Sequence, residues 1–436
     1  MVKRNLLKSV GSSSMVVLLG ASGAVKADFI SDSKATLSMR NLYFNNDNRQ
    51  TQQVKQEEWG QGFLLKYQSG FTDGTVGIGV DAMGALGIKL DSGAGRHNGS
   101  SFFPDADGKA ADEFSAMGLT AKAKVSQTEL RYGTLQPVLP ILVNNDGRLL
   151  PQWFHGVQAT SKEIDNLTVV AGGLEDVKDR NSTDSLGLAI SGAGGASGQR
   201  SNKFYYGGLD YKFTPNLLGQ YYYANLKDFY TQSFLGLVHT LPLPVGKLTS
   251  DLRYFHSDSD GKNGSVAGRA EGYRSTGYYG NGVTSGEVDN DTISATFTFA
   301  LGGHKLIGAY QTVNGDSNMP FISQGYGSTV YLTSNSQITS FTRAGERTWM
   351  AGYSYDFGAV GLPGLFTKLM YLSGDNVRSA RGDLNEWERD LTLSYVVQSG
   401  PLKNFGMTWL NGSLRGSAAT DTDENRIYLT YVFPIF

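Results

Sequence analysis

The 436-residue sequence has no cysteine, and this absence excludes both a disulfide framework and a thiolate metal site. Charged residues make up only 18% of the chain, below the roughly 25% that is typical of soluble domains. Beyond the N-terminal segment, no stretch reaches the ~18 consecutive apolar residues that a transmembrane helix requires. With a hydrophobic content of 40%, the composition fits a chain whose side chains alternate between two environments.

The N-terminus has the features of a secretory signal peptide. Basic residues near the start precede a mostly apolar stretch over residues 10–20, and small residues then lead to Val25-Lys26-Ala27. This arrangement is typical of export with cleavage at an A-x-A-like site, and the apolar stretch is too short to span ~30 Å of hydrocarbon. We therefore predict a signal peptide over residues 1–27 and a single mature domain over residues 28–436. Because the mature chain carries more acidic than basic residues, nucleic acid is not expected as a partner.

The dominant pattern of the mature chain has a period of two residues. In Thr292–Leu301, apolar side chains at the odd positions alternate with Thr, Ser and Ala at the even positions. Successive side chains of a strand point to opposite faces, so this segment has one apolar and one polar face. The pattern recurs in residues 349–357 and 390–395 and, less regularly, in about residues 34–44, 59–71, 74–90, 117–132, 203–213, 217–227, 248–256, 304–313, 363–373, 403–413 and 425–435.

Such strands form either a soluble sandwich, whose apolar faces meet inside, or a membrane barrel, whose apolar faces meet lipid. The strands are ~10 residues long with aromatic residues near their ends, as in the interfacial girdles of outer-membrane barrels. Short turns such as Thr214-Pro215-Asn216 alternate with long polar connections over residues 91–116, 175–202 and 257–290. The chain would be outsized for a sandwich but suits ~16–18 strands, and a barrel of that size leaves a water-filled lumen. The sequence therefore predicts an all-β, antiparallel transmembrane barrel that ends on the aromatic Phe436.

Three irregular motifs carry a family resemblance. They read TELRYGTLQPVLPILVNNDGRLLPQWFHG (residues 128–156), YDFGAVGLPGLFTKLMYLSGDN (355–376) and EWERDLTLSYVVQSGPLKNFG (386–406). Together they resemble the OprD-type porins, which are substrate-specific channels of bacterial outer membranes. The resemblance implies 18 strands, a loop that folds inward and narrows the pore, and passive uptake of small carboxylate-bearing solutes, such as amino acids or aromatic and organic acids, along a series of basic residues.

Strand periodicity identifies charged residues that should face the lumen, since a charge at mid-depth on the lipid face costs roughly 2–4 kcal/mol. Arg40 shares its face with Thr36 and Ser38, opposite Leu37 and Met39. The same argument gives Lys122, Lys124 and Arg253. These basic residues either form weak sites for an anion in series or merely balance lumenal acids such as Asp81 and Asp356.

Strand periodicity and the family resemblance give different orientations for Arg389. Its periodicity places it on the apolar face that continues at Leu391, whereas the resemblance implicates the arginine of the E-W-E-R-D motif in the channel wall. We follow the resemblance and count Arg389 among the pore-lining residues. Elsewhere the family's basic residues are replaced, by Met370 and by the run Thr408-Trp409-Leu410-Asn411, so the pore should accept less acidic and more apolar solutes than its relatives do.

In the expected constriction loop, Asp146 and Arg148 place both signs of charge close together. Opposed charges across a narrow aqueous gap would orient dipolar solutes, while a salt bridge between them would only stiffen the loop. Both arrangements are compatible with the sequence. Asp146 and Arg148 complete the expected pore-lining residues.

Other classes of outer-membrane barrel are less well supported. The histidines lack a convincing catalytic partner set, although His256 stands near Asp258 and Asp260. An outer-membrane enzyme and a structural or adhesive barrel remain the alternatives to a channel. No metal or cofactor is expected. The expected partners are small solutes, outer-membrane lipid and lipopolysaccharide, with the protein a monomer or a weak homotrimer in the bacterial outer membrane.

Overall fold

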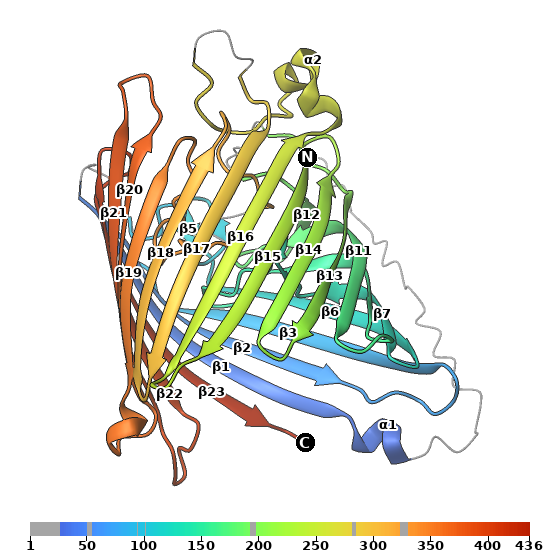
Figure 1. The fold of residues 1–436 in the computed structure, drawn as a ribbon. Coiled ribbons are helices and arrows are strands. Elements are labelled where there is room, and N and C mark those ends of the chain that lie inside the picture. Colours follow the sequence, from blue (N-terminus) through green and yellow to red (C-terminus); the bar gives the residue numbers. More distant parts are fainter. Residues whose placement is uncertain are drawn as a thin grey trace, which may run out of the picture.

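The computed structural model describes residues 27–49, 55–93, 95–100, 102–191, 198–280, 285–322 and 330–436. Within these residues, 18 antiparallel strands form one closed barrel (Figure 1). The barrel closes because β1 (Lys34–Asn48) pairs on one side with β2 (Gln56–Gln68) and on the other with β23 (Thr422–Pro434). Closure leaves no unpaired sheet edge, which a membrane barrel requires. Almost all of the predicted signal peptide, residues 1–26, lies outside the described residues.

The remaining wall strands pair in chain order. They are β3 (Gly77–Asp91), β6 (Glu113–Val125), β7 (Thr128–Leu135), β10 (Trp153–Ser161), β11 (Leu167–Lys178), β13 (Phe204–Thr214), β14 (Leu217–Leu226), β15 (Tyr230–Pro242), β16 (Lys247–Ser259), β17 (Asp289–Leu301), β18 (His304–Asn314), β19 (Arg347–Asp356), β20 (Leu365–Val377), β21 (Leu384–Val396) and β22 (Gly406–Gly416).

Minor elements lie in the connections. Two short helices are α1 (Ala27–Ser31) and α2 (Val266–Ala270), and two 3₁₀ turns are η1 (Gly261–Gly264) and η2 (Phe357–Val360). Short extra strands are β4 (Asp105–Ala106), β5 (Lys109–Ala110), β8 (Val138–Leu139), β9 (Leu142–Val143) and β12 (Ser185–Gly187). None of the helices in the described part of the chain has the length and apolar character needed to cross a bilayer.

The wall strands are arranged with their polar faces inward. In β17, Ile293 and Phe297 are about half exposed on the outside, whereas Thr292 and Ser294 are buried. The same division holds in β18, where Leu306 and Tyr310 are exposed and Gln311 is buried. A water-soluble sheet would show the reverse, so the exposed apolar bands are the surface that meets lipid. This confirms the predicted membrane barrel.

The connections differ at the two rims, as predicted. The turn between β13 and β14 is Pro215-Asn216, and the long connections lie at the opposite rim, where α2 sits in Figure 1. By the general rule for such barrels, the short turns face the periplasm and the long loops face the exterior. One predicted segment, residues 117–132, was wrong as a single strand. It contains most of β6 and most of β7, joined through Ser126-Gln127. Ser126 adopts a positive φ of 52°, which the sequence does not signal.

The apolar core lies inside the barrel, between the wall and loops that fold into the lumen. The largest cluster packs wall residues such as Phe204, Phe234 and Phe255 against loop residues such as Ile141 and Leu332. A second cluster joins Phe44, Phe102, Phe103, Leu149 and Trp153. Burying these side chains stabilises the loops within a lumen that would otherwise be filled with water. The loops therefore belong to the fold and define the pore.

Candidate functional site

The first lumenal loop, residues 136–152, connects β7 to β10 and lies against β1 inside the barrel. Arg40 of β1 fixes it there. The Arg40 Nη1 and Nη2 atoms donate to the two carboxylate oxygens of Asp146 at 2.8 and 3.1 Å. Nη1 also donates to the carbonyl oxygen of Arg148 at 2.6 Å. This planar, two-point contact fixes the tip of the loop to the wall strand β1 inside the barrel.

The second lumenal loop, residues 330–346, precedes β19 and lines one cavity together with the first loop. The Glu388 carboxylate on β21 accepts hydrogen bonds from the backbone N–H groups of Ile338 and Thr339 at 2.7 and 2.9 Å. Arg426 on β23 donates to the carbonyl oxygen of Gln337 at 2.7 Å. Wall side chains therefore satisfy the backbone of this loop, so it needs no secondary structure of its own.

A buried phenylalanine fixes the far end of the second lumenal loop. Phe341 is fully buried with Met350, Met370 and Leu372, although its φ of 52° is unfavourable for a bulky residue. Its carbonyl oxygen accepts a hydrogen bond from Gln311 Nε2 at 2.8 Å. The surrounding packing and this bond hold the backbone in the strained conformation.

The two loops line a cavity of about 260 Å³ inside the barrel, which we call the constriction. The charged side chains in its lining are Asp146, Arg148, Arg180 and Arg426. Asp146 is paired with Arg40, and Arg148, Arg180 and Arg426 are each less than 10% exposed. The other lining residues are Val143, Asn144, Asn145, Gly147, Asn335, Ser336, Gln337 and Ile338.

The arginines of the constriction are held by a buried glutamate. Arg426 Nε donates to Glu424 Oε1 at 2.6 Å, and Arg148 Nη2 lies 3.9 Å from Glu424 Oε2. The guanidinium of Arg148 also stacks 4.6 Å from the centre of the Phe44 ring. Burial, followed by repulsion from Arg426, lowers the pKa of Arg148 to about 10. Arg148 therefore keeps its charge at neutral pH.

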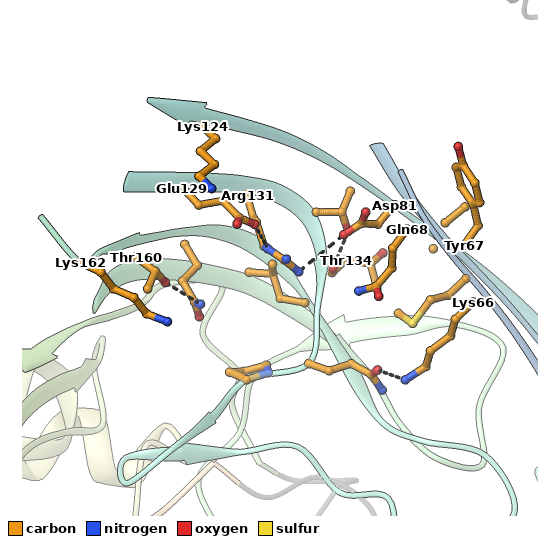
Figure 2. A pocket seen from close by; sticks show the side chains of 18 of the residues that line it. Lys66, Tyr67, Gln68, Asp81, Lys124, Glu129, Arg131, Thr134, Thr160 and Lys162 are labelled. Atoms are coloured by element: carbon orange, nitrogen blue, oxygen red, sulfur yellow. Dashed lines mark hydrogen bonds and ion pairs between the residues drawn. The ribbon is translucent and has the colours of Figure 1, made fainter. Parts of the chain in front are cut away.

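A larger recess of about 580 Å³ lies inside the barrel against β2, β3, β6, β7 and β10 (Figure 2). Its lining includes the bases Lys66, Lys124, Arg131 and Lys162 and the acids Asp81 and Glu129. Figure 2 shows these side chains on strands around one hollow, with Arg131 bonded to its acidic neighbours. Lys66 Nζ donates to Gln136 Oε1 at 2.9 Å, so the recess reaches the base of the first lumenal loop.

The predicted pore-lining residues have different environments. Arg40, Asp146 and Arg148 meet at the constriction, although Asp146 pairs with Arg40 and not with Arg148. Lys124 lines the recess. Lys122 lies in a buried ion pair with Asp81 at 2.7 Å, so it balances a lumenal acid, one of the two roles considered above.

Arg253 also faces the lumen but serves to hold a loop. Its guanidinium bonds to both carboxylate oxygens of Asp251 at 2.9 and 2.6 Å and donates to the carbonyl oxygen of Tyr331 at 3.1 Å. It lies 4.0 Å from the centre of the Tyr331 ring. Arg253 therefore connects the wall strand β16 to the second lumenal loop.

Arg389 does not line the pore. It pairs in register with Tyr371 and Ser413, while the neighbouring lumenal positions of β21 are Glu388 and Asp390. Strand periodicity therefore placed Arg389 correctly on the outer face, and the inference from the resemblance was wrong at this residue. A position inside a strand cannot turn inward without shifting the register of the whole strand.

Strand periodicity and the family resemblance did not identify several charged residues at the constriction and in the recess. The largest omissions are Arg426, Glu424 and Arg180 at the constriction and Lys66, Arg131 and Lys162 in the recess. Strand periodicity could have identified Arg426, because it alternates with the outward-facing Ile427 in the predicted segment 425–435. Arg180 lies in a loop after β11, where no periodicity applies.

Comparison with known proteins matches this architecture to one family. The profile of the outer membrane porins of the OprD family matches residues 27–435. The porin-like protein GalP of Pseudomonas putida is 35% identical over 414 residues, which cover 94% of this chain and 93% of that protein. The chain belongs to the OprD family of outer-membrane porins. This OprD-family porin is a substrate-specific channel of the bacterial outer membrane and not an enzyme.

Solved structures agree with this assignment. The porin is 54% identical to OccK8 (OprE) of Pseudomonas aeruginosa, with a TM-score of 0.88 over 94% of this chain and 100% of that chain. It is 34% identical to OpdK of the same organism, solved with vanillate, with a TM-score of 0.82 over 93% of this chain and 100% of that chain. The porin fold therefore extends over nearly the whole described chain.

Proposed function

We propose that this porin passes small carboxylate-bearing solutes, namely amino acids or aromatic and organic acids. The observation that carries the proposal is the charge of the two hollows along the pore. Arginines outnumber the single carboxylate in the lining of the constriction, and four bases face two acids in the recess. A carboxylate moving inward would meet an excess of positive charge at both places.

The chemistry of these groups suits a carboxylate. A guanidinium offers two parallel, charge-assisted hydrogen bonds to a planar anion, and an ammonium offers a compact positive charge. Because Glu424 partly neutralises Arg148 and Arg426, the constriction should bind an anion only weakly. Weak sites in series permit conduction, since a solute must leave each site as easily as it enters.

Apolar lumenal positions favour an acid with an aromatic or aliphatic body. Leu410 pairs in register with Arg426 and Thr408 with Tyr428, so both residues face the lumen. The relative OpdK, solved with vanillate, supports this choice, because vanillate is an aromatic carboxylate.

The test compares an anion with its neutral analogue. The lysines of the recess, Lys66, Lys124 and Lys162, have few structural contacts, and replacing all three by glutamine should leave the pore width unchanged. We expect benzoate permeation into liposomes to fall several-fold relative to benzamide permeation. Lys403→Gln, which removes one charge from an exposed turn, is the control. Equal permeation of benzoate and benzamide in all proteins would contradict the proposal.

We also propose that the chain is exported with cleavage after Ala27. The basic and apolar composition of residues 1–26 supports this, as does the start of the family match at residue 27. N-terminal sequencing of protein from outer membranes should find Asp28 first, and a retained leader would contradict it. The remaining proposed partners are lipopolysaccharide in the outer leaflet and, for the protein itself, a monomer or a weak homotrimer.

A further inference from the structure

The outer wall carries an arginine where a lipid-facing strand would be expected to be apolar. Arg389 is exposed on β21, and the next outward position toward the periplasm is Leu391. Leu391 pairs with Leu369 of β20, so the apolar band begins directly beside Arg389. The arginine therefore marks the boundary between this band and the polar outer rim.

Arg389 has unused hydrogen-bonding capacity. Its Nη2 atom donates to Asn411 Oδ1 at 3.1 Å and to Ser413 Oγ at 3.2 Å. Among the residues that the structure describes, no carboxylate lies within ion-pair distance of it, and its Nε and Nη1 atoms have no acceptor. Arg415, on the same outward face, is instead paired with Asp423 at 2.7 Å. Arg389 is thus an exposed, uncompensated charge with unused donors.

Stacked aromatic rings lie beside this arginine on the neighbouring strands. The ring centres of Trp349 and Tyr371 are 5.3 Å apart, and those of Tyr371 and Trp387 are 5.7 Å apart with an interplanar angle of 25°. Tyr371 pairs in register with Arg389, and Trp387 pairs with Arg415. Aromatic girdles sit at the level of the lipid headgroups, which places Arg389 at that depth in the outer leaflet.

We propose that Arg389, Asn411 and the Tyr371–Trp387 stack form a binding site for the phosphorylated sugar headgroup of lipopolysaccharide. The guanidinium would take a phosphate through two parallel charge-assisted hydrogen bonds. The Asn411 amide and Ser413 hydroxyl hold the guanidinium in place, and the aromatic faces offer a flat apolar surface to a sugar ring. The acyl chains would then follow the apolar band that starts at Leu391.

The unpaired positive charge of Arg389 favours lipopolysaccharide over a second barrel as the molecule that covers this face. The outer leaflet presents a phosphorylated glycolipid at the depth of Arg389, and burial of an unpaired arginine against a second barrel would leave it without a counter-charge. The inference deepens the lipopolysaccharide contact proposed above. It does not depend on which solute the channel carries.

The experiment measures lipopolysaccharide on four proteins purified from the same outer membranes: the wild type, Arg389→Gln, Arg389→Lys and Lys403→Gln. Lys403 lies in the turn that joins β21 to β22, at the periplasmic end of the same hairpin. Its replacement by glutamine removes the same charge as Arg389→Gln but at the other rim. We expect native mass spectrometry to show bound lipopolysaccharide on the wild type and on Lys403→Gln. Titration of delipidated protein should give about tenfold weaker binding for Arg389→Gln. Arg389→Lys should fall between the two, because it keeps the charge but loses the planar fork.

Binding of dephosphorylated lipid A and the oligomeric state of the variants test whether the phosphate and the lipid are recognised. Lipid A stripped of its phosphates should bind wild type and Arg389→Gln equally, and equal binding of intact lipid A to both proteins would overturn the proposal. A change in oligomeric state on Arg389→Gln without loss of lipopolysaccharide would assign this face to a second barrel and would also overturn it. Benzoate permeation should be the same in Arg389→Gln and wild type, so failure of the carboxylate proposal would be seen separately.

Discussion

Replacing Arg40 by glutamine should loosen the first lumenal loop. The change removes the two-point contact with Asp146 and the hydrogen bond to the carbonyl oxygen of Arg148. A hydrogen bond to a charged group contributes ~1.5–3 kcal/mol, whereas an exposed ion pair contributes ~0.2–1 kcal/mol. Arg40 is 26% exposed and Asp146 51%, so we take an intermediate loss of ~1–2 kcal/mol. That loss would raise the population of displaced loop conformations roughly 5–30-fold.

The assay is single-channel recording in a planar bilayer. We expect Arg40→Gln to show larger and noisier conductance than wild type, because the loop no longer stays in one position across the pore. Asp146→Asn should behave similarly, and the double variant should be little worse than either, since both changes remove the same contact. Arg40→Lys is the control that keeps the charge without the fork. Quiet recordings of wild-type conductance from both single variants would refute the idea that this pair holds the constriction.

Three further outcomes follow from the lumenal contacts. Deleting residues 139–149 should raise conductance and weaken discrimination among solutes, provided that the heat-induced gel shift shows a folded barrel; unchanged conductance would mean that the loop does not narrow the pore. Thr408→Arg with Leu410→Arg should fold and make the channel more anion-selective, measured as a shift in reversal potential, because both positions face the lumen. Finally, burial, helped by the nearby Glu386, raises the pKa of Glu346 well above its usual value. Its contribution to stability should therefore be complete below pH ~4.5 and decline as pH rises through the folded-state pKa, and Glu346→Gln should flatten this decline in the unfolding midpoint.

The sequence was sufficient for the architecture because its signal is local and repeated. Alternation over ten residues fixes which side chains share a face, and a chain built of such segments with short and long connections has few alternatives to a barrel. The same local rule placed Arg40 inside and Arg389 outside, and following the family motif at Arg389 replaced a correct deduction with a wrong one. The boundary at Ser126 was missed because a single residue with positive φ leaves no mark in the pattern.

The tertiary structure decided the pore itself. Residues 320–342 are an uncharged stretch without strand periodicity, and part of this segment lies in the lumen because Glu388 and Arg426 on distant strands bind its backbone. The sequence also could not predict which charged residues pair with each other. Arg40 and Asp146 are separated by 106 positions and meet only when the barrel closes. Periodicity states which face a side chain occupies, but depth and partner depend on the register of strands far apart in the chain. The sequence by itself therefore determined the barrel and the direction of its side chains, whereas the constriction, the recess and the role of each charge depended on contacts that only closure of the barrel creates.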